Sequence, residues 1–300
     1  MRRRIITEEL IKIYRRNLVN DEKREQTIEK YIRDVGKLAD FLGGREITKQ
    51  RMIAYKQYLE KCGLYCVTSI NSYIAAANNM CEIFGWHELK VKMIKVQRET
   101  FVQEDKELTH VEYEKLISTA MNTGNERLAL IIQTLGSTGI RISELPFVTV
   151  ESLKCGTASV YNKGKVRKVF IPDKLCRVLL KYAQSREIYS GIVFCSRSGR
   201  PLDRSNIWRE LKKLCRCAGV SESKVYPHNI RHLFARKFYM IKKDIVRLAD
   251  VLGHSSIETT RIYVKSSGKE HKKLLDSMNM VISDVRHKSR KCSCMPESTT

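Results

Sequence analysis

The sequence predicts a mainly helical protein of two domains with one small β-sheet, and three observations lead to this expectation. Its 300 residues, 42% of them hydrophobic, are enough for two domains with cores of ordinary size. Residues 1–100 contain no proline and carry apolar side chains three and four positions apart, the pattern of successive amphipathic helices. Beyond residue 145, where all five prolines lie, a short β-rich stretch interrupts the helical pattern.

The first domain is predicted to be a bundle of helices at about 7–19, 22–42, 48–61 and 67–84. From Gln97 to Lys106 the apolar periodicity gives way to charged and polar residues, which indicates a boundary. We therefore expect a helical domain over residues 1–100 and a second domain over residues 107–285.

The second domain is predicted to be mixed. Thr109 and Glu112 have the spacing of a capping box, so a helix is expected to begin there. Residues 158–172 read as a β-hairpin around the turn Asn162-Lys-Gly-Lys165. Helices are expected at about 109–122, 126–137, 173–185, 203–218, 228–240, 244–252 and 256–264, and a polar, disordered tail at 286–300.

The charge of the chain indicates a polyanionic partner. The 56 basic and 33 acidic side chains give a formal charge of +23, which disfavours an ordinary small-metabolite enzyme. Residues 1–103 carry 20 basic and 13 acidic side chains, and residues 104–300 carry 36 and 20, so both halves are cationic. Two basic halves suit a nucleic acid gripped from both sides, although a solvated lysine-rich surface is the alternative.

Several sequence features predict a cytoplasmic protein with no membrane partner and no metal. No stretch approaches the ~18–20 apolar residues of a membrane span, and the basic N-terminus is not followed by the apolar region of a signal peptide. The ten cysteines are scattered, so they are read as reduced thiols. Three close pairs lack the paired spacing of a zinc site: Cys62 and Cys66, Cys215 and Cys217, Cys292 and Cys294.

Two histidines and an arginine lie where each can meet a phosphate. His228 and Arg231 are three positions apart on a predicted helix and share one face, although a solvated helix face also produces this spacing. His254 precedes a helix that Ser255 and Glu258 are predicted to begin as a capping box. A helix N-terminus binds anions, so His254 can donate a hydrogen bond to one lodged there.

A second arginine and two further groups complete the set. Arg141 follows a glycine break, and Glu144 comes one helical turn later, where its carboxylate can orient the guanidinium. A hairpin lysine and Tyr263 add an ammonium group and a phenol. Two arginines, two histidines, a lysine and a tyrosine can cleave a phosphodiester without a metal.

Four motifs occur in an order that resembles the tyrosine recombinases of the phage integrase family, in particular the Xer-like members. His254 comes 26 positions after His228, and Tyr263 comes nine positions after His254, which fits the resemblance. It covers about residues 109–265 by motif, and residues 1–100 only by size and helix content. The motifs are Thr138-Gly-Ile-Arg-Ile-Ser-Glu-Leu145, Asn162-Lys-Gly-Lys165, His228-Asn-Ile-Arg-His-Leu-Phe-Ala235 and Leu252-Gly-His-Ser-Ser-Ile-Glu-Thr-Thr-Arg-Ile-Tyr263.

The resemblance implies a role for each residue of the set. Tyr263 is the expected nucleophile, and four residues are expected to surround the scissile phosphate: Arg141, Arg231, His228 and His254. His228 is the candidate base, since a phenol with a pKa near ~10 attacks phosphorus only when its proton is taken. Lys163 is the favoured proton donor to the leaving oxygen, with Lys165 as the alternative, while His232 is expected to pack or support. A covalent phosphotyrosine conserves the bond energy, so no ATP or other cofactor is expected.

The resemblance also implies an assembly. A helical core-binding domain and a mixed α/β catalytic domain are expected to close as a C-shaped clamp on duplex DNA with an inverted-repeat core site, in a bacterial cytoplasm or nucleoid. Four protomers would exchange strands through a Holliday junction, for integration or excision of a mobile element, inversion or dimer resolution. A helix at 270–282 is expected to dock onto a neighbouring protomer or else onto its own domain, and an accessory excision factor is possible. A type IB topoisomerase and a non-catalytic DNA-binding protein are the alternatives.

Overall fold

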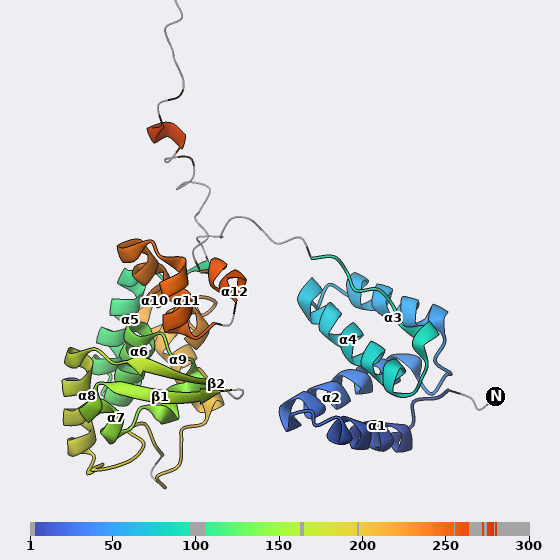
Figure 1. Ribbon diagram of the computed structural model, residues 1–300, viewed down its shortest axis with the longest axis horizontal. Coiled ribbons are helices and arrows are strands. Elements are labelled where there is room, and N and C mark those ends of the chain that lie inside the picture. Colours follow the sequence, from blue (N-terminus) through green and yellow to red (C-terminus); the bar gives the residue numbers. More distant parts are fainter. Residues whose placement is uncertain are drawn as a thin grey trace, which may run out of the picture. The chain divides into compact units, whose positions relative to one another are not determined.

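The computed structural model describes residues 4–96, 106–162, 165–196, 198–254, 256–263, 272, 275–278 and 280, and at 162 and 165 the backbone alone. The chain divides into two compact units, Met1–Glu99 and Thr100–Thr300, each with its own hydrophobic core (Figure 1). The predicted fold class, mainly helical with one small sheet, is confirmed. Within the predicted helix at 270–282 the structure describes only residues 272, 275–278 and 280, of which 272 and 275–277 are helical, and the predicted tail at 286–300 lies outside the described residues.

In the described residues of the first unit, the regular elements are all helices. Its core holds Tyr14 and Leu18 of the first helix against the other three. The second helix begins three residues later than predicted, because Glu22 adopts a left-handed backbone (φ 53°) in a turn. The elements are α1 (Glu8–Asn20), α2 (Glu25–Leu42), α3 (Lys49–Lys61), α4 (Val67–Ile83) and the 3₁₀ helix η1 (His87–Leu89).

The second unit combines helices with a two-stranded sheet. Its first helix starts at the predicted capping box, in which the Glu112 amide donates to Thr109 Oγ1 (3.2 Å) and the Thr109 amide donates to Glu112 Oε2 (2.8 Å). The elements are α5 (His110–Asn122), α6 (Glu126–Thr138), η3 (Ile142–Phe147), α7 (Val150–Cys155), β1 (Thr157–Asn162), β2 (Lys165–Phe170), α8 (Asp173–Ser185), α9 (Arg204–Ala218), α10 (Pro227–Lys242), α11 (Ile245–Leu252) and α12 (Ile257–Arg261).

The sheet is the predicted antiparallel hairpin. Ala158 pairs with Val169 and Val160 with Arg167, so these four side chains share the face that packs on the unit. The opposite face is exposed, because side chains alternate along a strand. Arg167 is therefore an arginine at an inward position.

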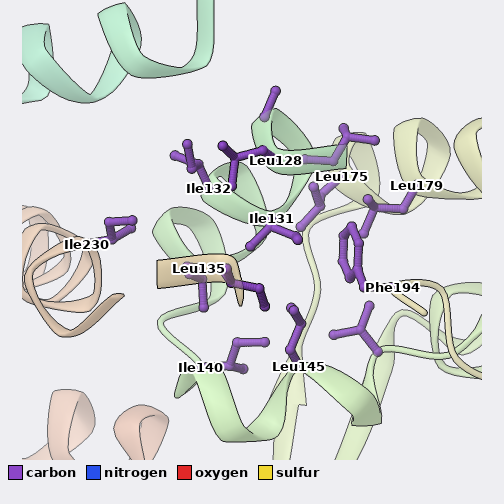
Figure 2. Packing of buried hydrophobic residues seen from close by; sticks show 14 of the residues in the cluster. Leu128, Ile131, Ile132, Leu135, Ile140, Leu145, Leu175, Leu179, Phe194 and Ile230 are labelled. Carbon is purple, nitrogen blue, oxygen red and sulfur yellow. The ribbon is translucent and has the colours of Figure 1, made fainter. Parts of the chain in front are cut away.

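Helix α6 lies at the centre of the core of the second unit. Leu128, Ile131, Ile132 and Leu135 of α6 pack against side chains from α8, from α10 and from the loop that contains Phe194 (Figure 2). The helix ends at Gly139, whose φ of 63° is left-handed, and the Phe234 ring fills the space that a Cβ would need there. The end of α6 is thereby fixed two residues before Arg141.

One element of the second unit was not predicted, and one predicted helix cap was wrong. Helix α7 was not predicted, because six residues are too few to show helical periodicity; Thr149 caps it by accepting from the Ser152 amide (3.2 Å). The capping residue of α12 is Ser256, whose Oγ accepts from the Glu258 amide (3.2 Å), and not Ser255. Among the helices of the described residues, none is long and apolar enough to cross a membrane.

Candidate active site

Arg141 is held by a buried carboxylate. Glu144 Oε2 accepts from the backbone N of Arg141 (2.8 Å), and Glu144 Oε1 accepts from Arg141 Nη1 (3.0 Å). Burial by itself raises the pKa of Glu144, but the bonds to Arg141 and the charge of Arg167 outweigh it, so the pKa lies below its ordinary value. The Arg141 side chain is 36% exposed, so this pair presents an oriented guanidinium to solvent.

Arg231 is buried and joins two segments. Helix α10 carries it one turn after its first residue, Pro227. Its Nη1 donates to the Gly139 carbonyl at the end of α6, and its Nη2 donates to the Leu252 carbonyl at the end of α11 (2.7 Å). Burial, and then the charge of Arg141, lower its pKa to about 10. Arg231 therefore remains a cation at neutral pH.

His254 follows α11 directly and lies beside Arg231. Its Nε2 is 3.0 Å from Arg231 Nη2, and its Nδ1 is 2.9 Å from Thr260 Oγ1. Because an arginine only donates, Nε2 accepts here and the ring proton lies on Nδ1. Burial, and then the charge of Arg231, lower the pKa of His254 to about 4. A phosphate oxygen bound between His254 Nε2 and Arg231 Nη2 would favour the tautomer with the proton on Nε2. The Thr260 hydroxyl is compatible with either tautomer, because it can accept from Nδ1 or donate to it.

The Tyr263 ring is enclosed by three imidazoles. It lies just after α12, in a turn in which its amide donates to the Thr260 carbonyl (2.9 Å). The ring centroids of His232, His254 and His228 are 5.0, 5.5 and 5.7 Å from that of Tyr263, and the His254 ring is stacked on it. The side chain is buried.

The phenol also lies within electrostatic reach of a cation. The charge of the Tyr263 phenolate would raise the pKa of Arg231, opposing the burial that lowers it. Helices α10 and α11 and the short α12 carry these groups and lie together in the second unit (Figure 1). The three histidines, Arg231 and Tyr263, which are spread over residues 228–263, are thus brought to one place.

The two histidines of α10 differ in their surroundings. Burial, and then the charges of Arg231 and Arg141, lower the pKa of His228, so its imidazole is neutral and able to take a proton. Burial, and then the charge of His228, lower the pKa of His232 to about 4, while a hydrogen bond to the backbone of Ile262 opposes this. His232 packs on Tyr263 and contacts the residue before it, which suits the supporting role expected of it.

Of the two hairpin lysines, the structure describes only the backbone of Lys165. Lys163 lies outside the described residues. Lys165 begins β2, where its backbone pairs with Asn162. Both stay predicted candidates for the proton donor.

Sequence reasoning did not single out three residues that contact this set. Thr260 contacts His254, Glu107 Oε1 lies 3.5 Å from His232 Nδ1, and Arg167 Nη2 lies 2.5 Å from Glu144 Oε2. An arginine at an inward position of a strand is a signal that could have identified Arg167. In the described ranges, no three His, Cys, Asp or Glu side chains gather as a metal site requires.

The arrangement can perform chemistry on a phosphodiester. Arg141 and Arg231 supply two fixed cations for the non-bridging oxygens and for the charge that grows in the transition state. The three neutral imidazoles supply groups that accept or donate a proton near Tyr263. The site thus combines a phenol, neutral imidazoles and two guanidinium groups, the kinds of group that phosphodiester cleavage without a metal uses.

Comparison with known proteins gives matches over most of the chain. The model of the phage integrase family matches residues 106–270. The tyrosine recombinase XerA of Pyrococcus furiosus is 27% identical over 290 residues, which are 94% of this chain and 98% of that protein. The tyrosine recombinase XerD of Staphylococcus aureus is 25% identical over 280 residues, which are 84% of this chain and 92% of that protein.

A solved structure shares the fold. The crystal structure of a lambda integrase tetramer bound to a Holliday junction aligns with a TM-score of 0.68 at 17% identity. The alignment covers 87% of this chain and 78% of that one. At this identity the likeness concerns the fold alone.

Proposed function

Because this chain belongs to the phage integrase family and is a tyrosine recombinase that breaks and rejoins DNA strands, we propose that Tyr263 is its nucleophile in site-specific recombination. The family resemblance predicted from four motifs is thereby confirmed. The observation that carries the proposal is the position of the Tyr263 phenol, enclosed by three neutral imidazoles and within electrostatic reach of the buried Arg231.

The proposed first step is attack of the Tyr263 oxygen on phosphorus. His228 takes the phenolic proton, because its lowered pKa keeps the imidazole neutral. Arg141 and Arg231 bind the non-bridging oxygens of the scissile phosphate. A P–O bond to the phenolic oxygen forms, the bond to the 5′-oxygen breaks, and a proton from Lys163, or from Lys165 in its place, neutralises the leaving group.

The second step is the reverse reaction with another strand. The 3′-phosphotyrosine retains the energy of the broken bond, so a 5′-hydroxyl from a partner strand can attack it without ATP. When an oxygen of the phosphate accepts a hydrogen bond from Arg231, the ring proton of His254 moves from Nδ1 to Nε2. Nε2 then donates a hydrogen bond to the phosphate. Glu144 and His232 act on Arg141 and Tyr263 respectively, without touching the substrate.

We further propose the assembly that the resemblance implies. Both cationic units bind duplex DNA with an inverted-repeat core site, and four protomers exchange strands through a Holliday junction. The segment 270–282 docks onto a neighbouring protomer. The possible accessory factor, the cytoplasmic or nucleoid location and the choice among integration, excision, inversion and dimer resolution stay predictions.

Covalent trapping tests the nucleophile. Duplexes selected from a random library by binding to the full chain are nicked near each candidate cleavage position and incubated with the protein. Wild type is expected to give a DNA adduct that survives denaturing electrophoresis, Tyr263→Phe to bind without an adduct, and the exposed control Tyr189→Phe to match wild type. An adduct with Tyr263→Phe would place the nucleophile elsewhere, and relaxation of supercoils without site preference would indicate a topoisomerase.

A further inference from the structure

Two arginines connect the same pair of segments in the second unit. The first segment, residues 139–144, carries Arg141, and the second, residues 251–254, carries His254. Arg231 spans them by donating to the Gly139 and Leu252 carbonyls. Arg167 spans them a second time, since its Nη2 contacts Glu144 Oε2 (2.5 Å) and its Nη1 donates to the Val251 carbonyl (2.8 Å).

Arg167 is built into this position. It comes from the inward face of β2, and its side chain is only 14% exposed. Gly253, with a left-handed φ of 63°, lies against its Cδ and Nε, where a Cβ would collide. Among the described residues, its Nε is buried without a hydrogen-bond partner. Burying a cation with one N–H unpaired costs free energy, so packing alone does not account for an arginine here.

The contacts of Arg167 lead to two phosphate-binding groups. Glu144 holds Arg141 through its side chain and its backbone amide, and Arg167 holds Glu144. The Val251 carbonyl lies three residues before His254, at the end of α11. The planar guanidinium donates to these two acceptors from separate nitrogens held in a fixed geometry, whereas all three donors of a lysine lie on one rotatable nitrogen.

We propose that Arg167 is a positioning residue for strand cleavage: it sets Arg141 and His254 at the separation that one phosphate requires. This inference rests on the proposed function, because it concerns the same site. Arg167 acts through Glu144 and through the end of α11. Its loss should slow the chemical step more than it weakens DNA binding.

Adduct formation by full-chain variants tests this. At saturating nicked duplex, Arg167→Met should slow adduct formation by about 10- to 100-fold, since a displacement of ~1 Å of a reacting group can cost about 10²-fold. The DNA concentration at half-saturation should change by less than about threefold. Arg167→Lys, which keeps the charge and one contact, should fall between Met and wild type. Arg216→Met, an 80% exposed arginine on α9, is the matched control and should equal wild type.

A double-variant cycle separates positioning from general destabilisation. If Arg167 acts through Glu144, Arg167→Met combined with Glu144→Gln should be as slow as the slower single variant, within about twofold to threefold. Rates that multiply instead would overturn the inference, as would a wild-type rate for Arg167→Met or a loss that lies only in DNA affinity. Thermal unfolding verifies folding of each variant, and if Arg167→Met does not fold, Arg167→Lys replaces it in the cycle.

The experiment distinguishes this inference from the proposed function. Absence of a Tyr263-dependent adduct from wild type overturns both. A normal wild-type adduct, with Arg167→Met equally fast, overturns the positioning role alone.

Discussion

Replacing the buried carboxylate between two arginines should destabilise the second unit substantially. Glu144→Gln keeps the size of the side chain but puts an amide nitrogen opposite an arginine donor. The carboxylate accepts two charge-assisted hydrogen bonds, from Arg141 Nη1 (3.0 Å) and Arg167 Nη2 (2.5 Å), and the amide breaks one of them and removes the negative charge from the acceptor of the other. Such bonds contribute about 1.5–3 kcal/mol each, and Arg141 belongs at the low end because it is 36% exposed. We expect a loss of about 3 kcal/mol, at the lower end of the ~3–5 kcal/mol for breaking a buried pair.

The pH dependence of this loss has a definite sign. The pKa of Glu144 is lowered in the folded protein, so its stabilising effect is present above the ordinary pKa of 4.5 and is lost as the pH falls through the folded value. The difference in free energy of unfolding between wild type and Glu144→Gln should therefore be nearly equal at pH 7 and pH 5. At pH 4 it should be smaller by up to about 0.8 kcal/mol.

Urea unfolding followed by tryptophan fluorescence measures the difference. Trp208 lies in α9 of the second unit and Trp86 in the first, so a Trp86→Phe background reports the second unit alone. Comparison within that background cancels any effect of the fluorophore change. A difference in free energy of unfolding below about 1 kcal/mol at pH 7 would refute the stabilising role of the Glu144 carboxylate, and so would a difference that increases at acidic pH.

Three further outcomes are expected. Gly139→Ala should lower the free energy of unfolding by about 1–3 kcal/mol, because φ is 63° and the new Cβ would collide with Phe234. The loss should be visible as a lower melting temperature. Thr109→Ala should cost about 1 kcal/mol in urea unfolding through the lost cap. The free energy of unfolding should fall as the pH drops from about 6.5 toward 4, because His232 and His254 have pKa values near 4 when folded and therefore bind protons more readily in the unfolded chain. His232→Gln should make this pH dependence less steep.

Most of the helices could be predicted because their determinants are local. The capping box at Thr109 and the apolar periodicity of α6 are short-range patterns, and both appear where they were expected. Helix α7 could not be found in this way because six residues give no period, and Ser255 and Ser256 are adjacent, equally good caps. The sequence alone does not distinguish them, and in the structure Ser256 is the cap.

The composition of the candidate site was predictable, but its connections were not. Four motifs indicated which residues to expect around a phosphate, in an order that the fold brings together. The sequence contained no sign that Arg231 donates to a carbonyl 92 positions away, or that Arg167 donates to one 84 positions away. Such contacts depend on how α6, α11 and the hairpin pack.

The sequence by itself determined the helical elements, the cationic character and the chemical groups of this recombinase, because periodicity, caps and side-chain chemistry act over a few residues. Only the tertiary structure decided the surroundings of the imidazoles and the contacts by which Arg167 joins two segments. A pKa depends on burial and on charges from distant segments, and a guanidinium can span two segments only after packing has placed them within reach of one side chain.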